Sequence, residues 1–488
     1  MLAELAQQIA EMTGYPIWLI SVVFKVLIIS LVFFPLISVI AVIAIWGERK
    51  VAGHIQGRLG PKHVGPFGLL QSPADGIKLL FKEDTVPGDA DGMLFRLAPY
   101  IAFAPVFAAF LVIPFGPQFV FEATLNIGVL YLLAILGLEV MAVIMSGWGS
   151  NSKWAIYGAM REACQMVSYE IPLGVAILCG VLVAGTLNLS ELSYLQGGGL
   201  HTWLMFHNPF IFIAFFIYFI ASLASSKRAP FDLPESESEL VAGFHTEYSG
   251  LRWSMFFFAE YAGMFIIGCI LAVLYMGGWN SPLGPWDPVY MALGYDPVAS
   301  GQAYLTGQLT GITNWGDLSG EMGLKGGAIG LFALNSYCTV WVIAKASFVI
   351  LLHMWIRWTL PRIRIDQVMH GCVKGLLPVS LAMFVGTAVW LALIGPTAEA
   401  RGVYSSISAN VPNLTGEVMG VQLVAQIVLM LVGLALFGFY CAVVVWSFIV
   451  RKRAPRKGIF EDVMPVGKDV AFTRGPGYVP DDVRNAVT

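Results

Sequence analysis

Long runs of apolar residues make up most of the chain, and short polar segments separate them. A helix that crosses a membrane needs about 20 consecutive, mainly apolar residues. Nine windows meet this requirement, at about 17–46, 98–116, 127–148, 166–187, 208–226, 253–276, 331–356, 376–395 and 421–450. The pattern therefore predicts an all-α polytopic membrane protein with about nine transmembrane helices.

The composition supports a membrane protein and excludes several other classes. Hydrophobic residues account for 57% of the 488 residues and charged residues for only 12%, which is about half the charged share of a typical soluble domain. A disordered chain, a coiled coil, a nucleic-acid binder or an ordinary cytosolic enzyme would carry more charge. The apolar residues of this chain need a lipid environment.

Sequence motifs for bound cofactors are absent. The six cysteines form no Cys-x-x-Cys pair, which argues against an iron–sulfur or zinc site. The chain has no Walker A motif, and no Gly-x-Gly-x-x-Gly follows a strand pattern. We therefore expect no metal, flavin or NAD bound to this chain.

Basic residues occupy alternate segments between the predicted spans. Of the 28 Lys and Arg residues, 24 lie in the segments 47–97, 149–165, 227–252, 357–375 and 451–488. Cytoplasmic loops carry an excess of Lys and Arg, so we expect these five segments in the cytoplasm and the N-terminus outside. The expected organisation is a membrane domain over 1–450, with a core at about 17–395 and an extra span at about 421–450, followed by a polar tail at 451–488.

A short amphipathic helix is predicted at 68–82. Ser72 followed by Asp75 is a capping-box pattern, and Pro73 suits the first helical position. Apolar residues share one face of this helix, namely Leu70, Ala74, Ile77, Leu80 and Phe81. Such a helix is expected to lie in the membrane interface.

Two polar loops combine basic residues with turn or anchor signals. One carries Gln56 and Arg58 beside the Gly-Pro pairs at 60–61 and 65–66. The other carries Arg362 and Arg364 shortly after two tryptophans. Both loops are consistent with topology signals or membrane anchors, and equally with a polar cavity that receives a ligand headgroup.

Carboxylates occur where apolar surroundings make them costly. Glu170 and Glu260 lie inside predicted spans, where an ionisable side chain is a functional candidate by default. Four further candidates lie on the loop between the fifth and sixth spans, namely Asp232, Glu235, Glu237 and Glu247. Burial and nearby like charge disfavour ionised carboxyls, so we expect these groups to exchange protons near neutral pH. Structural ion pairs and a solvated acidic loop remain alternatives.

Taken together, the motifs in these regions resemble the membrane-embedded H subunit of the proton-pumping NADH-quinone oxidoreductase, respiratory complex I, called subunit 1 in mitochondria. They span residues 47 to 374, about two-thirds of the chain, in order. The motifs are E-R-K, Q-x-R-x-G-P, G-P-F-G-L-L-Q, G-W-x-S-N-S-K, S-Y-E, R-A-P-F-D-L-P-E-x-E-S-E-L-V-A-G-F, E-Y-S-G, A-E-Y and P-R-x-R-x-D-Q.

The resemblance implies a function that spacing alone does not show. Members of this family form the membrane wall of the quinone chamber, and they hold acidic residues that lead towards antiporter-like subunits. The resemblance places Gln56, Arg58, Arg362 and Arg364 at the chamber. It places the six carboxylates, Glu170, Asp232, Glu235, Glu237, Glu247 and Glu260, in the proton pathway.

The resemblance also implies partners and a location. Quinone would be the substrate, held at the interface with neighbouring subunits, and this chain would have no complete active site of its own. The implied partners are iron–sulfur and 49-kDa-type peripheral subunits, small membrane subunits and antiporter-like subunits. The implied location is the bacterial inner membrane.

Two features of the sequence depart from the family pattern. Ser225-Ser226-Lys227 stands where many members have Glu-Thr-Asn, and Glu139 adds a mid-span carboxylate that matches no family position. A homologous subunit of a membrane hydrogenase, or of a ferredoxin- or coenzyme-linked complex, remains a close alternative. A stand-alone secondary transporter would show inverted repeats, which the halves of this sequence do not clearly show. A purely structural anchor would leave Glu170 and Glu260 without a reason to be buried.

Overall fold

The computed structural model describes residues 34–120, 125–233, 240–305, 315–325 and 327–393, together with 424, 427–433 and 435. The chain divides into two compact units, Met1–Met430 and Leu431–Thr488. Only residues 431–433 and 435 of the second unit are described, and they are helical. Helices and turns account for the regular structure of the described residues, which contain no strand.

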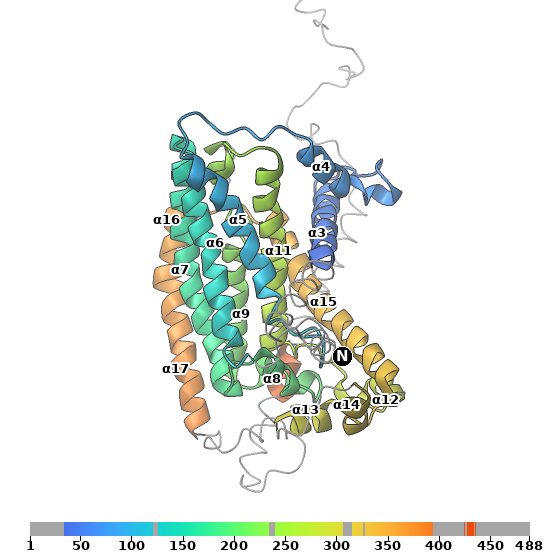
Figure 1. Ribbon diagram of the computed structural model, residues 1–488. Coiled ribbons are helices and arrows are strands. Elements are labelled where there is room, and N and C mark those ends of the chain that lie inside the picture. Colours follow the sequence, from blue (N-terminus) through green and yellow to red (C-terminus); the bar gives the residue numbers. More distant parts are fainter. Residues whose placement is uncertain are drawn as a thin grey trace, which may run out of the picture. The chain divides into compact units, whose positions relative to one another are not determined.

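The first unit is a bundle of long helices with short helices at its ends (Figure 1). The long helices are α3 (Phe34–Ile55), α5 (Gly92–Ala109), α6 (Gly128–Gly149), α7 (Lys153–Ala184), α9 (Pro209–Ser225), α11 (Gly250–Tyr275), α15 (Gly327–Thr359) and α17 (Leu377–Leu393). The short α-helices are α4 (Gln71–Leu80), α8 (Leu189–Tyr194), α12 (Pro288–Leu293), α13 (Pro297–Leu305), α14 (Trp315–Glu321) and α16 (Ile365–His370). The π-helical segment η7 (Gly371–Leu376) joins α16 to α17.

Six described segments are long and apolar enough to cross a membrane, and α9 is apolar but shorter. This confirms an all-helical membrane protein. Helices α6 and α9 coincide with the predicted windows 127–148 and 208–226 to within one residue at each end. The count of nine stays a prediction, because most of the first and ninth windows lies outside the described residues.

Helix α7 differs from its prediction. It begins at Lys153, 13 residues before the predicted window 166–187, and its 32 residues correspond to a length of about 48 Å. The added part is mixed polar and apolar, which a hydropathy window does not detect. Glu170 therefore lies well inside the helix rather than near the start of a span.

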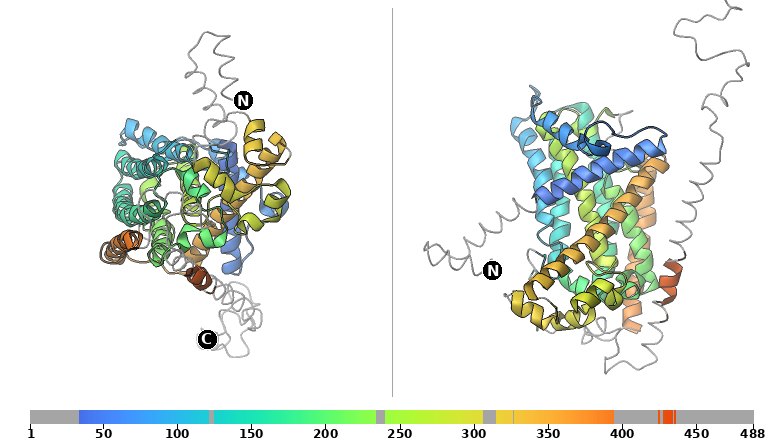
Figure 2. Two further views of the ribbon diagram at one scale, coloured as in Figure 1. Left: turned by 90° about the horizontal axis from the view of Figure 1, so that it is seen from below. Right: turned by 90° about the vertical axis from the view of Figure 1, so that its right-hand side faces the viewer.

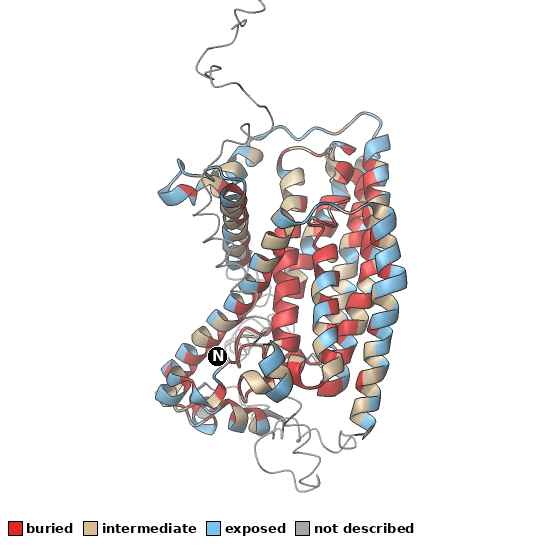
Figure 3. Ribbon diagram, turned by 180° about the vertical axis from the view of Figure 1, so that it is seen from behind, coloured by how far each residue is buried: buried red, intermediate tan, exposed pale blue. Residues whose placement is uncertain are grey.

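Helix α11 is the central element of the bundle. It packs against α3, α5, α7, α9 and α15, and 89% of its most apolar window is buried, against 11% for the segment that contains α17. Burial is concentrated on α11 and falls towards the outer helices (Figure 3). Two further views show the long α15 crossing the bundle beside α3 (Figure 2), and these two helices are in contact. Polar side chains on α11 are therefore enclosed by protein.

The capping box predicted for the amphipathic helix is wrong. Helix α4 begins at Gln71 and its N-cap residue is Leu70, with no side-chain cap. The Asp75 carboxylate instead accepts hydrogen bonds from Arg49 Nη1 at 2.6 Å and Gln71 Nε2 at 3.1 Å. Asp75 forms an ion pair with Arg49 of α3, so its carboxylate does not complete the capping box.

The apolar face of α4 is exposed as predicted. Ile77, Leu80 and Phe81 are 56%, 59% and 87% exposed. Whether a membrane interface covers this face stays a prediction.

Candidate functional site

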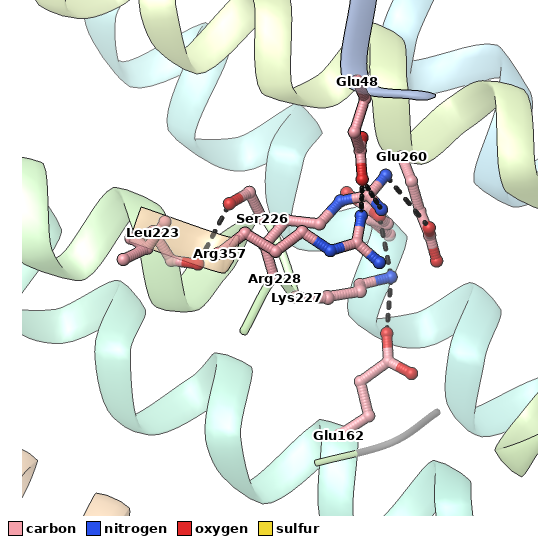
Figure 4. Close-up of polar contacts among 9 residues, drawn as sticks. Glu48, Glu162, Leu223, Ser226, Lys227, Arg228, Glu260 and Arg357 are labelled. Carbon is pink, nitrogen blue, oxygen red and sulfur yellow. Dashed lines mark hydrogen bonds and ion pairs between the residues drawn. The ribbon is translucent and has the colours of Figure 1, made fainter. Parts of the chain in front are cut away.

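A buried network of ion pairs lies where the chain leaves α9. Arg357 of α15 donates a hydrogen bond from Nη1 to Glu48 Oε1 of α3. Arg228, in the loop after α9, lies with Nη1 3.8 Å from the same Glu48 oxygen and with Nη2 3.8 Å from Glu260 Oε2. Glu48, Arg228 and Glu260 are 5%, 4% and 7% exposed. Figure 4 shows their charged groups pointing toward one another, so this network links α3, α11 and α15.

Lys227 forms a second group beside this network. Its Nζ atom lies 2.5 Å from Glu162 Oε1 of α7 and 2.9 Å from Glu139 Oε1 of α6. The exposed fractions of these side chains are 3% for Lys227, 0% for Glu162 and 15% for Glu139. Burial alone would lower the pKa of Lys227, but the neighbouring carboxylates outweigh it and raise the pKa above its usual range. The lysine is therefore a fixed positive charge held between two helices.

The local backbone explains why Lys227 and Arg228 point inward. Helix α9 ends at Ser225 with Ser226 as its C-cap, and Ser226 Oγ donates to the Leu223 carbonyl at 2.9 Å (Figure 4). Lys227 follows with φ of 54°, in the left-handed region. The chain reverses there, and Phe231 N donates to the Arg228 carbonyl at 2.8 Å. Two consecutive basic side chains are thereby directed into the bundle rather than to its surface.

A small cavity joins the two predicted intramembrane carboxylates to this group. Glu170 of α7 and Glu260 of α11 line it together with Glu139, Lys227 and Gly263. The cavity measures about 20 Å³, which is enough for a water molecule with polar partners. The structure thus brings together Glu170 and Glu260, two of the six predicted carboxylates.

The remaining predicted carboxylates have different places. Asp232 is half-buried beside the ion-pair network; burial is the main cause that raises its pKa, and the Arg357 charge opposes the rise. Glu247 is half-buried between the short helix Gly243–His245 and α11. Glu235 and Glu237 lie outside the described residues.

A second, more open cavity of about 530 Å³ lies at the predicted quinone loop. Its lining is mainly basic and turn residues, namely Arg49, Arg58, Leu59, Gly60, Pro61, Lys62, His63 and Gln71. Arg58 Nε donates to Gln56 Oε1 at 2.6 Å, and both side chains are exposed. Arg58 therefore presents positive charge in a hollow beside α4.

Arg362 and Arg364 do not line this cavity. Both are exposed in the loop between α15 and α16. Ile363 N, between them, donates to the Pro230 carbonyl at 3.1 Å. This bond joins the arginine loop to the loop that carries Asp232 rather than to the loop of Arg58.

Sequence reasoning missed several members of the site. Glu48, Glu162 and Arg357 lie just outside the predicted spans, and Lys227 and Arg228 counted only as charges in a basic loop. One signal was available, because Gly158, Glu162, Gln165 and Tyr169 recur at helical spacing on α7 and all are buried. Glu162 is the polar group on that face whose burial demands a partner. Among the described residues, no group of three His, Cys, Asp or Glu side chains is placed to hold a metal ion.

Comparisons with known proteins identify the family of this chain. A family model described as NADH dehydrogenase matches residues 27–388. The H subunit of NADH-quinone oxidoreductase from Chlorobium luteolum is 45% identical over 349 residues, which cover 71% of this chain and 84% of that protein. An H subunit of the same enzyme from Cytophaga hutchinsonii, the one numbered 2, is 40% identical over 383 residues, covering 73% of this chain and 96% of its own length. The H subunit from Anaeromyxobacter dehalogenans is 38% identical over 414 residues, covering 85% and 89%. The chain therefore belongs to the NADH dehydrogenase family, the H-type membrane subunits of the NADH:quinone oxidoreductase complex.

Proposed function

We propose that this protein forms part of the wall of a quinone chamber and carries an acidic pathway that couples quinone reduction to proton translocation. The observation that carries the pathway is the small cavity shared by Glu170 and Glu260, because it brings carboxylates from two helices to one water-sized space. The names of the relatives favour this function over that of a membrane hydrogenase or a ferredoxin-linked complex.

The chemistry of the pathway follows from charge in a poorly screened interior. Reduction places negative charge on the quinone until protons arrive. At an effective dielectric constant of about 20, a unit charge about 10 Å away changes the free energy of a carboxylate by about 1.7 kcal/mol. That amount shifts a protonation equilibrium slightly more than tenfold. The ion pairs from Glu48 through Arg228 to Glu260 provide a continuous polar route along which such a change acts.

The quinone-binding part of the proposal rests on the basic cavity and the amphipathic helix. A quinone headgroup has two carbonyl acceptors, which suit the donors of Arg58 in the cavity and of Gln56, its hydrogen-bond partner outside the lining. The apolar tail suits the exposed apolar face of α4. Arg362 and Arg364 would complete the chamber from the loop after α15. Peripheral iron–sulfur and 49-kDa-type subunits would cover this side, and the antiporter-like and small membrane subunits would contact the bundle.

The proposed orientation in the membrane rests on the distribution of Lys and Arg along the sequence. The basic loops would face the cytoplasm of a bacterial cell, and the N-terminus would lie outside the inner membrane. This places the open basic cavity on the side where soluble subunits can reach it.

The proton pathway is tested by Glu170→Gln and Glu260→Gln in the assembled complex. Gln keeps the size of Glu but carries no exchangeable acid proton, so both variants should assemble and translocate fewer protons per quinone reduced. Vesicles with a pH-sensitive dye report proton movement, and quinone reduction is followed in parallel. Glu321→Gln is the matched control, since this glutamate is exposed on α14. Wild-type ratios and rates in both Gln variants would mean that these carboxylates are structural.

The quinone site is tested by Arg58→Ala and Arg364→Ala. Loss of one exposed charged donor costs up to about 1 kcal/mol, so the KM for quinone should rise about three- to fivefold. Arg96→Ala, at an exposed position of α5, is the control. Unchanged quinone kinetics in both variants would reject the assignment.

A further inference from the structure

Lys227 occupies a backbone position that favours glycine. It directly follows the C-cap of α9 and has φ of 54°, a left-handed conformation that helices commonly reach with Gly after their C-cap. For a residue with a side chain, this conformation is strained and persists only where the surroundings determine it. A lysine here indicates that its side chain is needed in the interior.

The interactions of the side chain show what determines this position. The Nζ atom contacts Glu162 at 2.5 Å and Glu139 at 2.9 Å, and it lies 5.4 Å from the centre of the Phe244 ring. The carboxylates come from α7 and α6, so one ammonium joins two helices. An ammonium has three N–H donors, and after two carboxylates one donor remains for the cavity that Lys227 also lines.

The charge of this group is unbalanced. If all three members are ionised, two negative charges face one positive charge in a site that solvent barely reaches. A buried net charge is costly, and a proton held between the carboxylates removes it. The group is therefore neutral when it holds one proton, and it carries a net negative charge when that proton leaves.

The cavity connects this group to the proposed pathway. Glu139 and Lys227 line it from one side, and Glu170 and Glu260 also reach it. Glu162 does not line the cavity, but it forms an ion pair with Lys227, which does. Lys227 is thus the junction between the cavity and the most deeply buried carboxylate of the site.

We propose that Lys227 is a positioning residue for proton translocation, and that it brings Glu139 and Glu162 into the pathway as a site that stores one exchangeable proton. This inference rests on the proposed function of the acidic pathway. The role of the lysine is that of a counter-charge: it holds the two carboxylates together and keeps the shared proton exchangeable with the cavity.

The test compares Lys227→Met, Lys227→Arg and Glu162→Gln in the assembled complex, with Lys153→Met as the control at the exposed start of α7. Lys227→Met should reduce the protons translocated per quinone reduced, and Glu162→Gln should do the same. Lys227→Arg keeps the positive charge and should restore most of the ratio.

Infrared spectroscopy supplies a readout that a merely structural lysine would not change. Without its counter-charge, a buried carboxylate is neutralised by a proton. Lys227→Met should therefore add a C=O stretching band of a protonated carboxylic acid, and a second change, Glu162→Gln or Glu139→Gln, should remove that band. Absence of the band in Lys227→Met, or a wild-type proton ratio in this variant, would overturn the inference.

A second variant keeps the inference testable if Lys227→Met fails to assemble. Lys227→Met combined with Glu162→Gln removes one positive and one negative charge, so the net charge of the group is unchanged, and this pair should assemble. If the single and the double variant both fail to assemble while Lys227→Arg assembles, the lysine is structural and the inference is wrong. Normal translocation in Glu170→Gln and Glu260→Gln would instead remove the proposed function itself. Impaired translocation in those two, with normal translocation in Lys227→Met and Glu162→Gln, would remove only this inference.

Discussion

Gly158 on α7 offers a direct test of how the site is held in place. A Cβ atom at this position would lie 2.6 Å from Gly243 Cα, 2.7 Å from Gly243 C and 2.7 Å from Phe244 N. All three are backbone atoms, so they cannot move aside as a flexible side chain would. Ordinary contact begins at 3.4 Å, and Gly158→Ala must therefore separate α7 from the Gly243–His245 segment by about 1 Å.

The expected loss of stability combines one favourable effect of the alanine with two unfavourable ones. Alanine in a helix interior is favoured over glycine by about 1 kcal/mol, and forced overpacking costs about 1–3 kcal/mol. Glu162 lies one turn after Gly158, and Phe244 lies beside the Lys227 ammonium. The displacement therefore also weakens the contact between Lys227 and Glu162, and such a charged hydrogen bond contributes about 1.5–3 kcal/mol. The net loss in the free energy of unfolding should be about 1.5–5 kcal/mol.

The assay is thermal inactivation of the assembled complex, with the proton ratio measured in vesicles. Gly158→Ala should inactivate at a lower temperature and translocate fewer protons per quinone reduced. Gly174→Ala is the matched control, because it lies on the same helix and a Cβ there meets nothing within 4 Å; it should be neutral or slightly stabilising. If Gly158→Ala matches Gly174→Ala in both measurements, the packing argument is wrong.

Two further predictions concern the frame of the protein. Asp91 caps α5 by accepting hydrogen bonds from Met93 N at 3.1 Å and Leu94 N at 3.4 Å. Asp91→Ala should destabilise the assembled complex by about 0.5–2 kcal/mol, as measured by thermal inactivation. An equal loss of stability in Asp91→Ser would argue against a capping role. Ala299→Cys tests the topology at an exposed position of α13, in a background without the exposed Cys164. The new cysteine should react with a membrane-impermeant thiol reagent from the outside only. Labelling only from the cytoplasm would reverse the proposed orientation.

The extent to which the sequence predicts the fold depends on what each helix contacts. Windows of uniform hydropathy located α6 and α9 closely, because lipid or protein surrounds every side of these segments. The start of α7 escaped detection because Lys153, Arg161, Glu162 and Gln165 lower the mean hydropathy of residues 153–165. Glu162 finds its partner, Lys227, in the loop after α9. The amphipathic helix was located, but its start was not, since Asp75 forms an ion pair with Arg49, which lies 26 residues earlier on α3.

The residues of the site also differ in how far the sequence predicts their role. Glu170 and Glu260 could be selected from the sequence because each carboxylate interrupts an apolar run. Glu48 and Glu162 lie just outside the predicted spans, where charges are ordinary. Only the helical spacing of Glu162 with other buried residues of α7 distinguishes it. Lys227 and Arg228 belong to a basic loop by sequence and to a buried network by structure. That difference arises from the left-handed backbone conformation at Lys227, which cannot be inferred from a count of charges.

Gly263 of α11 has a consequence for hydration. This residue lines the small cavity, and a Cβ atom there would meet only Glu139 Oε2, at 3.9 Å. Glycine is therefore required neither by backbone conformation nor by close packing at this position. A single added methyl group would fit without strain and would take up the room that a water molecule needs. In the proposed pathway, the room for water beside the carboxylates that line this cavity, and with it proton transfer between them, therefore depends on the absence of one methyl group on α11.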